Sequence, residues 1–268
     1  MGGRVIVVTG CASGIGRHLV SAFMRRGDAV IASDVAFAKL EEAGREDGWE
    51  SGRVLAIELD VVEPASWEVA LDRGEARFGP ITHLVNNAGV LMPDWVVNVA
   101  DMDVHRQLDI NVKGVVFGTR AAARRMVERR QGHIINIGSL ASLSPVPGLS
   151  IYAASKFAVR GFSLSAALEL GEHGVAVTVV MPDAVATPML DLQKGRTEAA
   201  LTFSGGKVLS GVDIERALLS VFEKRPLEVA IPESRGILAR VANLMPGVGR
   251  AIAPLMRRLG ESNRKKAR

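Results

Sequence analysis

Short, continuous runs of β-branched and other apolar residues alternate with longer amphipathic stretches over the first two-thirds of the chain. Continuous apolar runs, as opposed to a strict alternation, are typical of parallel strands that helices cover on both faces. The pattern predicts strands at residues 4–8, 29–34, 53–59, 82–86, 133–138, 175–181 and 228–231, with helices at 15–26, 37–48, 64–78, 103–130 and 152–172. Strand–helix alternation with short connections gives right-handed crossovers. We therefore expect an α/β fold, a doubly wound parallel sheet of about seven strands in a single domain.

Two segments depart from this alternation. Residues 183–211 contain several glycines and little apolar periodicity, which predicts a mobile lid. Residues 234–268 place apolar side chains at three-to-four spacing with arginines between them, which is typical of amphipathic helix. We expect Pro246 and Pro254 to divide that segment into short helices, because proline interrupts the helical hydrogen bonds.

The composition is that of a packed globular protein. The chain has 268 residues, of which 48% are apolar and 23% charged, and this excludes disorder and collagen-like structure. Cys11 is the only cysteine, so an internal disulfide is excluded, and this fits a reducing, cytoplasmic location. The apolar runs fall short of the ~20 residues of a membrane-spanning helix. The N-terminus lacks the shape of a signal peptide, so we expect no secretory leader.

The net charge of +4 is unevenly distributed. Residues 235–268 carry nine Lys or Arg and one acidic residue, a net +8, so the rest of the chain is −4. Aromatic residues make up only 4%, which disfavours nucleic-acid binding, since that function needs stacking platforms. The basic amphipathic end leaves two alternatives open: a peripheral contact with an anionic membrane surface, or ordinary helices that cover the lid.

A glycine-rich loop follows the first predicted strand. It reads TGCASGIG from Thr9 to Gly16 and leads directly into a helix. Glycines in this strand–turn–helix context let a pyrophosphate approach the helix N-terminus, which makes the expected sheet Rossmann-like. Asp34 ends the second strand, where a carboxylate accepts the adenosine ribose hydroxyls and repels a 2′-phosphate. Ser13 and Val35 stand at positions where a cation could bind the 2′-phosphate of NADP, and both are uncharged. The sequence therefore favours NAD over NADP.

The only tyrosine, Tyr152, lies four residues before Lys156 on a predicted helix. Residues at this spacing share a helix face, so we expect the ammonium to lower the pKa of the phenol and to suit it for proton transfer. Ser139 ends the strand at 133–138, where its hydroxyl can bond a carbonyl or alcohol oxygen.

Together these motifs resemble the short-chain dehydrogenase/reductase family, over about residues 4–231. The glycine loop is similar to the family's TGxxxGxG motif, residues 86–89 to its NNAG segment, and 182–189 to its PGxVxTxM segment. The resemblance implies a catalytic set in which Asn111 holds a water of the proton relay, together with Ser139, Tyr152 and Lys156. It also implies the cofactor contacts Thr9, Gly10, Ser13, Gly14, Ile15, Gly16, Asp34, Asp60, Val61, Asn87, Ala88, Gly89, Tyr152, Lys156, Pro182, Val185 and Thr187.

One position departs from the family pattern. Asp183 stands where the family usually has glycine after the proline, which puts the local loop path in question. The five histidines are scattered without metal-ligand spacing, so we expect no metal site.

The apolar character of the lid and of the segments after NNAG and Ser139 predicts a hydrophobic small-molecule substrate, steroid-, sterol- or lipid-like. No arginine is obviously placed to bind a substrate carboxylate. We therefore expect an NAD-dependent oxidoreductase that interconverts a secondary alcohol and a ketone by hydride transfer. The catalytic domain would span 1–233, with the basic extension at 234–268, and the resemblance implies a homotetramer or homodimer. An NADPH-dependent 3-oxoacyl or carbonyl reductase is the alternative within enzymes, and a non-catalytic dinucleotide-binding regulator is the alternative from another class.

Overall fold

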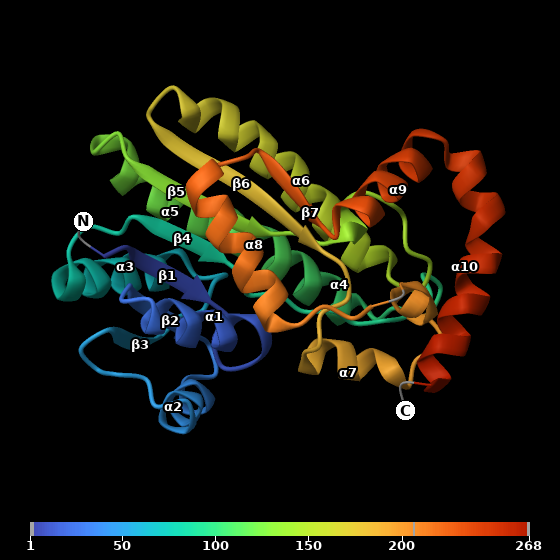
Figure 1. Cartoon of the computed structure of the whole chain (residues 1–268), viewed down its shortest axis with the longest axis horizontal. Helices are drawn as coiled ribbons and strands as arrows, with labels where there is room; N and C mark the ends of the chain where they lie inside the picture. Colours follow the sequence, from blue (N-terminus) through green and yellow to red (C-terminus); the bar gives the residue numbers. More distant parts are fainter. Residues whose placement is uncertain (1–2, 206, 267–268) are drawn as a thin grey trace.

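In a computed structural model, which describes residues 3–205 and 207–266, seven parallel strands form one sheet in the order β3-β2-β1-β4-β5-β6-β7 (Figure 1). The strands are β1 (Val5–Thr9), β2 (Ala29–Asp34), β3 (Val54–Glu58), β4 (His83–Asn86), β5 (Gly132–Ile137), β6 (Val175–Pro182) and β7 (Glu228–Ile231). The helices that alternate with them are α1 (Gly14–Arg25), α2 (Phe37–Glu46), α3 (Pro64–Phe78), α4 (Asp101–Leu108), α5 (Gly114–Glu128), α6 (Ser150–Gly171) and α8 (Gly211–Lys224). The single-domain α/β sheet predicted from the sequence is confirmed.

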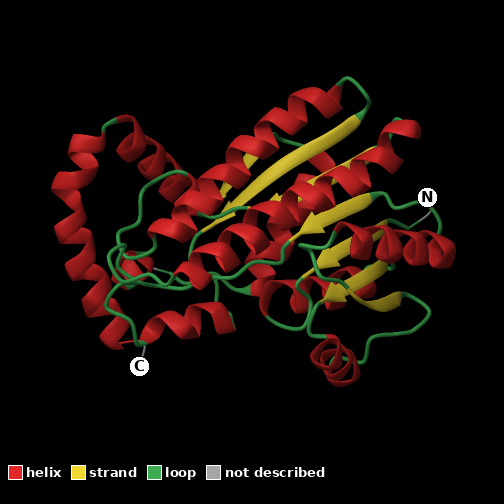
Figure 2. Ribbon diagram, turned by 180° about the vertical axis from the view of Figure 1, so that it is seen from behind, coloured by secondary structure: helices red, strands yellow, loops and turns green. Residues whose placement is uncertain are grey.

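Helices cover both faces of this sheet (Figure 2). On one face α1 and α8 pack against the strands, with Phe23 and Phe222 in tilted contact. On the other face α3, α5 and α6 enclose a second core around Trp67, which is fully buried. Both faces are apolar, which is why the strands appear in the sequence as continuous hydrophobic runs.

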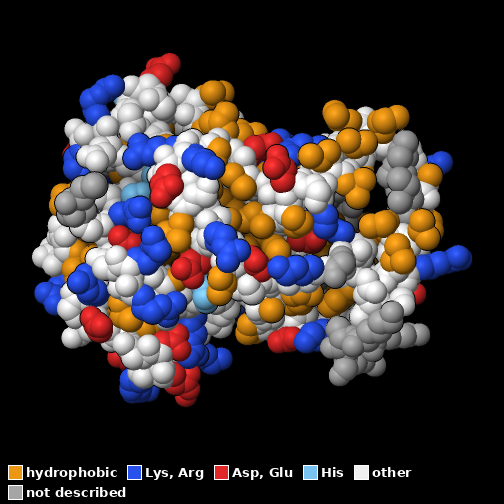
Figure 3. All heavy atoms as spheres, viewed as in Figure 1, with side chains coloured by type: hydrophobic (Ala, Val, Ile, Leu, Met, Phe, Trp, Pro, Cys, Tyr) orange, Lys and Arg blue, Asp and Glu red, His pale blue; other side chains and the backbone are white. Residues whose placement is uncertain are grey.

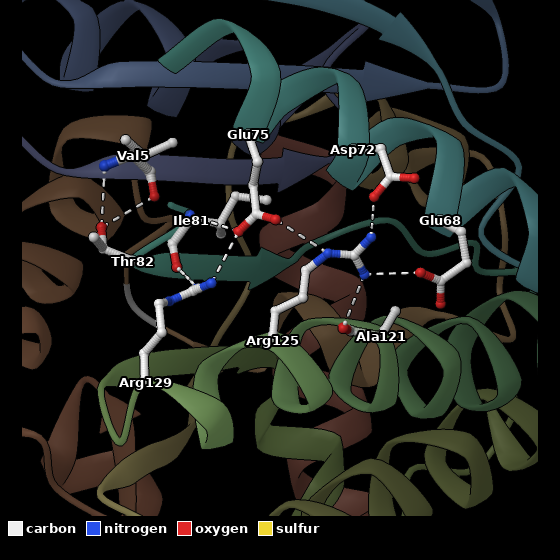
Figure 4. A network of polar contacts seen from close by, with 9 residues as sticks. All are labelled: Val5, Glu68, Asp72, Glu75, Ile81, Thr82, Ala121, Arg125 and Arg129. Carbon is white, nitrogen blue, oxygen red and sulfur yellow. Dashed lines mark hydrogen bonds and ion pairs between the residues drawn. The ribbon is translucent and has the colours of Figure 1, made fainter. Parts of the chain in front are cut away.

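An ion-pair network ties α3 to α5 at the edge of the second core (Figure 4). The Arg125 guanidinium bonds Glu68 at 2.8 Å and Glu75 at 3.2 Å and also pairs with Asp72. Arg129 bonds Glu75 as well, at 3.2 Å. These arginines therefore fix the packing of two helices.

The strand order reverses between β1 and β4, which pair directly. Crossovers leave in opposite directions from this point, so a crevice opens beyond the carboxyl ends of the two strands. The Thr9 hydroxyl, at the end of β1, accepts hydrogen bonds from the backbone N–H groups of Asn87 and Ala88 at 3.0 and 2.9 Å. One threonine thus fastens the glycine loop to the NNAG segment.

The single helix predicted at 103–130 is wrong in its middle. Between α4 and α5 lies a π-helical turn, η1 (Asp109–Lys113), which contains the fully buried Asn111. The wider turn places an extra residue in the helix and lets the Asn111 side chain reach Val90. Such turns occur frequently at functional sites, and apolar periodicity gives little sign of them.

The segment predicted as a lid contains α7 (Pro188–Lys194) and a 3₁₀ turn, η3 (Ala200–Ser204). The C-terminal segment forms α9 (Glu233–Leu244) and α10 (Pro246–Lys266), which arch away from β7 and return to the lid (Figure 1). The break at Pro246 is confirmed, but the break at Pro254 is wrong, because this exposed proline lies inside α10. The side chains of Val248 and Ile252 and the cations from residue 264 onward lie outside what the structure describes. Within residues 3–205 and 207–266, no helix is both long and apolar enough to cross a bilayer.

Candidate active site

A cavity of about 670 Å³ lies along the carboxyl edge of the sheet. Its walls come from the glycine loop, the NNAG segment, the end of β5, α6, the loop after β6, the lid and the two C-terminal helices. The polar residues gather at the sheet edge, while the lid and α9 contribute mainly apolar side chains such as Met189, Leu190 and Leu238. The cavity therefore joins a polar end to a hydrophobic chamber.

The loop at the polar end requires glycine at three of its positions, Gly10, Gly14 and Gly16. Gly10 has φ +72°, and a Cβ there would lie 2.9 Å from the Ala88 Cα. Gly14 has φ +57°, and a Cβ on Gly16 would lie 2.1 Å from the carbonyl oxygen of Gly10. Gly10, Ser13, Gly14 and Ile15 line the cavity at the N-terminus of α1, where the two glycines leave the backbone uncovered by a side chain. This cradle fits the pyrophosphate of a dinucleotide, which binds backbone N–H groups at a helix N-terminus.

Asp34 lies in the lining beyond this cradle, held by two backbone amides. Its Oδ2 accepts from Ala12 N and its Oδ1 from Ala36 N, both at 2.9 Å. The nearest arginine of α1, Arg17, pairs with Glu46 at 2.9 Å and with Asp47 at 2.5 Å. Its guanidinium is engaged by these carboxylates, so the adenosine end of the cavity keeps an acidic character.

Ser139, Tyr152 and Lys156 come together in the wall where the two ends of the cavity meet. Ser139 follows β5 and caps a 3₁₀ turn, η2 (Leu140–Ser142), with its Oγ accepting from Ala141 N at 3.1 Å. Tyr152 and Lys156 lie one turn apart on α6, and the Lys156 Nζ is 5.6 Å from the centre of the Tyr152 ring. The same Nζ donates to the Ile137 carbonyl at 2.9 Å, which ties the lysine to β5.

The expected lowering of the Tyr152 pKa by Lys156 is wrong in this structure. Burial raises the pKa of Tyr152 to about 12, and a hydrogen bond with Ser139 opposes the rise. Burial also lowers the pKa of Lys156 to about 8. The physical reason is desolvation, which penalises the phenolate and the ammonium alike when both lie in the protein interior.

Asn111 lies behind the cavity wall. Its Oδ1 accepts from Val90 N at 2.8 Å, and its Nδ2 donates to Val90 O at 2.9 Å and to Ser155 Oγ at 3.0 Å. The side chain thus couples η1 to the segment after NNAG and to α6, one residue before Lys156.

Most of the predicted cofactor residues line the cavity, in addition to those already placed: Asn87, Ala88, Gly89, Pro182, Val185 and Thr187. Thr9, Gly16, Asp60 and Val61 do not. Thr9 and Gly16 fix the packing of the glycine loop, and Asp60 Oδ1 accepts from Val62 N at 3.0 Å. Val61 is buried against Gly114. A Cβ on Gly114 would lie 2.7 Å from the Cγ2 of Val61.

The sequence missed the wall that the C-terminal helices contribute. Its members share three-to-four spacing on α9 and α10: Arg235, Leu238, Ala239, Ala242, Asn243, Arg250 and Met256. The amphipathic pattern was the available signal. Such a pattern identifies the apolar side of a helix but does not identify what that side packs against. Two arginines, Arg235 and Arg250, also line the cavity, and Arg235 pairs with Asp183 at 2.5 Å.

Other reactive groups contribute nothing to this site. Cys11 is buried, donates its Sγ–H to Val8 O at 3.1 Å, and has a pKa raised by burial. Among the residues that the structure describes, no group of three or more His, Cys, Asp or Glu is arranged to hold a metal ion.

The fold and the site define a class, that of α/β proteins which place a Ser–Tyr–Lys set beside a dinucleotide cradle. The family model described as short chain dehydrogenase matches residues 4–197, and the chain belongs to this family. Three relatives show its range. The chain is 39% identical over 190 residues to a 3-alpha-(or 20-beta)-hydroxysteroid dehydrogenase of Mycobacterium tuberculosis, covering 70% of this chain and 72% of that protein.

The second relative is a 3-oxoacyl-[acyl-carrier-protein] reductase FabG of Thermotoga maritima, 32% identical over 75% of this chain and 82% of that protein. The third is a probable oxidoreductase EphD of Mycobacterium tuberculosis, 29% identical over 95% of this chain and 45% of that protein. The chain is therefore an NAD(P)-dependent oxidoreductase of alcohols and ketones.

Proposed function

We propose that this enzyme uses NAD to interconvert a secondary alcohol and a ketone on a hydrophobic substrate of steroid-, sterol- or lipid-like size. The observation that carries the proposal is the chamber itself, which sets Ser139 and Tyr152 against a wall of lid and C-terminal apolar side chains. Asp34, held by two amides and without a cation beside it in the lining, supports NAD over NADP. The hydroxysteroid dehydrogenase among the relatives supports the substrate class.

The nicotinamide of the bound cofactor accepts or donates the hydride. Val185 and Thr187, in the loop after β6, would hold the carboxamide, and Lys156 the adjoining ribose. The Ser139 hydroxyl would donate to the substrate oxygen and stabilise the negative charge that develops on it. The Tyr152 hydroxyl would transfer the proton to or from the same oxygen. Asn111 would anchor a water that links Lys156 to solvent, and its side chain is held by the Val90 backbone and Ser155.

Burial of Tyr152 makes the cationic form of Lys156 important for this step. The pKa of about 12 leaves little phenolate near neutral pH, so the ammonium must stabilise the phenolate as it forms. The carbonyl of Ile137 keeps Lys156 in place for this role.

An NADPH-dependent 3-oxoacyl reductase is the second candidate, and the FabG relative favours it. A dinucleotide-binding regulator is the candidate from another class. We place the catalytic domain at 1–233, with the lid at 183–211 and the extension at 234–268. We also propose a cytoplasmic location and a homodimer or homotetramer through α4–α5 and α6, which the exposed Leu168 of α6 supports.

We further propose that α9 and α10 contact an anionic membrane surface from their outer side. Hydrophobic side chains gather over these helices together with Lys and Arg (Figure 3). The exposed large apolar residues that do not line the cavity include Ile237, Val241, Leu244, Met245, Leu255 and Leu259. Apolar side chains interspersed with cations suit the interface of an anionic bilayer.

The substitution Tyr152→Phe tests the catalytic proposal. It removes only the proton-transferring hydroxyl, so turnover should fall at least about 10²-fold while NADH binding, measured by calorimetry, stays within about twofold. Oxidation of hydroxysteroids and fatty alcohols would be followed by NADH absorbance. Full activity in the variant excludes the assignment, and absence of turnover in the wild type with every alcohol and ketone favours the regulator.

A further inference from the structure

The residue that departs from the family pattern meets the first cation of the C-terminal segment. Asp183 follows β6 directly, and its Oδ2 lies 2.5 Å from the Nε of Arg235 on α9. The Asp183 side chain is 10% exposed and that of Arg235 is 28% exposed, and both line the cavity. The carboxylate that looked out of place in the sequence is therefore one half of an ion pair.

Three segments converge on this pair. The backbone of Asp183 donates to Ile231 O at 2.8 Å, which fixes the loop after β6 to the end of β7. A Cβ on Gly205 of the lid would lie 3.1 Å from the Asp183 Oδ2 and 3.4 Å from the Arg235 Cζ. The Arg235 Nη2 also reaches Ser204 Oγ at 3.5 Å. The pair thus joins the loop after β6, which the proposed function sets beside the nicotinamide and which is called the nicotinamide loop below, to the lid at Ser204 and Gly205 and to α9.

Asp183 and Arg235 compensate each other's charge in a place where both side chains are largely withdrawn from solvent. Burial raises the pKa of Asp183, and Arg235 opposes this rise. If Asp183 were the usual glycine, Arg235 would face an apolar chamber as an uncompensated cation, which is costly. The acid after the proline and the arginine at the start of α9 therefore compensate each other's charge.

Further contacts hold the far end of the C-terminal wall to the lid. A Cβ on Gly260 of α10 would lie 1.9 Å from the Ala200 carbonyl oxygen, and Asn263 donates to Phe203 O at 3.1 Å. Between that end and Arg235, the cavity side of α9 carries Leu238, Ala239 and Ala242. Arg240 of α9 also bonds Glu228 of β7 at 2.9 Å, so among the residues that the structure describes the Asp183–Arg235 pair is one of two ion pairs that hold α9, and it is the one that faces the cavity.

We propose that Asp183 and Arg235 are positioning residues that fasten α9 to the nicotinamide loop and lid and thereby set the affinity for large apolar substrates. This inference rests on the proposed function. Neither side chain is assigned to the substrate's reacting atoms, so the pair acts on the wall and leaves the Ser139–Tyr152–Lys156 set unchanged.

Limited trypsin digestion of the full chain tests the fastening without any substrate. D183N and R235Q should each increase cleavage after Arg240, Arg250 and Arg257 roughly tenfold, since an unpaired buried charge favours release of α9. The double variant should be cleaved no faster than the faster single variant, and R235K should restore protection. R258Q, which alters an exposed arginine of α10, is the matched control and should leave cleavage after Arg240 and Arg250 unchanged.

Steady-state kinetics test the consequence for substrate. In D183N and R235Q, KM for a hydroxysteroid should rise about tenfold with kcat within about threefold, while KM for cyclohexanol stays unchanged. Equal increases for both alcohols overturn the specificity role, and unchanged cleavage of the segment in both variants overturns the fastening. If the wild type oxidises neither alcohol, the proposed function fails while the digestion still decides the fastening. Cleavage throughout the chain would show that a variant is unfolded. The charge-conserving variants D183E and R235K would then test the fastening in its place, by the same digestion.

Discussion

The Asp34 carboxylate is oriented by the backbone N–H of Ala12, which donates to its Oδ2 at 2.9 Å. Because Ala12 belongs to the glycine loop, the acid at the end of β2 is fixed relative to the phosphate cradle. Asp34→Ala removes both this link and the ribose acceptor. We expect the Kd for NAD⁺ to rise about 10- to 100-fold, since hydrogen bonds to a charged group contribute about 1.5–3 kcal/mol each, and the preference for NAD⁺ over NADP⁺ to disappear.

Calorimetric titration with both dinucleotides measures this change. Glu41→Gln, which removes an exposed carboxylate of the neighbouring α2, is the control and should bind NAD⁺ as the wild type does. A wild type that binds NADP⁺ more tightly than NAD⁺ would contradict the role given to Asp34.

The sheet was predictable from sequence because each strand is buried on both faces and therefore carries an unbroken apolar run. The glycine loop and the Tyr152–Lys156 spacing were predictable for a related reason, since backbone conformation and helix geometry are local properties. Both depend on residues that are close in the chain.

The C-terminal wall and the tyrosine pKa could not be predicted in the same way. Whether an amphipathic helix turns its apolar side to a lid, a cavity or a membrane depends on contacts such as Gly260 against Ala200, sixty residues apart in the chain. The pKa of Tyr152 depends mainly on burial, with a smaller opposing effect of Ser139, and burial is set by the whole fold. The π-helical turn at Asn111 likewise follows from a distant partner, Val90.

Lys156→Met removes the charge of the lysine but keeps an unbranched side chain of similar length in the cavity wall. The variant removes the cation that stabilises the phenolate, so we expect kcat for alcohol oxidation to fall at least about 10²-fold. Burial lowers the pKa of Lys156 to about 8, so the wild-type rate should change as the lysine loses its proton near pH 8, and this change should be absent from the variant. Rates measured from pH 6 to 10 would show both effects.

Lys113→Met is the matched control, because this lysine is exposed and its ion pair is with Asp109, four residues earlier. Its pH profile should coincide with that of the wild type. A Lys156→Met enzyme whose profile keeps the change near pH 8 would show that Lys156 does not support proton transfer.

Acid should destabilise the protein through two buried histidines. His83 and His133 lie beside Phe222 in the core, and burial lowers their pKa values to about 3 and about 4. The unfolded chain binds their protons at a pKa near 6.5, so stability is full above about pH 6.5 and falls as the pH decreases towards 4. At pH 5 the loss should be on the order of 2 kcal/mol for each histidine.

Urea unfolding at pH 7.5, 6 and 5 measures this loss. His133→Gln should show a shallower decline between pH 6.5 and 5 than the wild type, even if its stability at pH 7.5 is lower. The exposed His173→Gln should keep the full decline. Equal pH dependence in all three proteins would exclude the buried histidines as its source.

We expect the outer side of α9 and α10 to bind the enzyme to anionic membranes. Because these helices also form a wall of the cavity, the test uses point variants of the full chain and leaves the segment in place. Full-length protein should sediment with vesicles of phosphatidylcholine and phosphatidylserine at low salt, and much less with phosphatidylcholine alone, because each cation near an anionic surface contributes about 1 kcal/mol. A Leu244→Glu, Leu255→Glu double variant should bind at least about fivefold more weakly, since both side chains are more than half exposed and would enter the interface. Val69→Glu, an equally exposed apolar position on α3, is the control and should not change binding. Equal sedimentation of the wild type and the double variant would contradict the membrane contact and favour the alternative in which these helices only cover the lid.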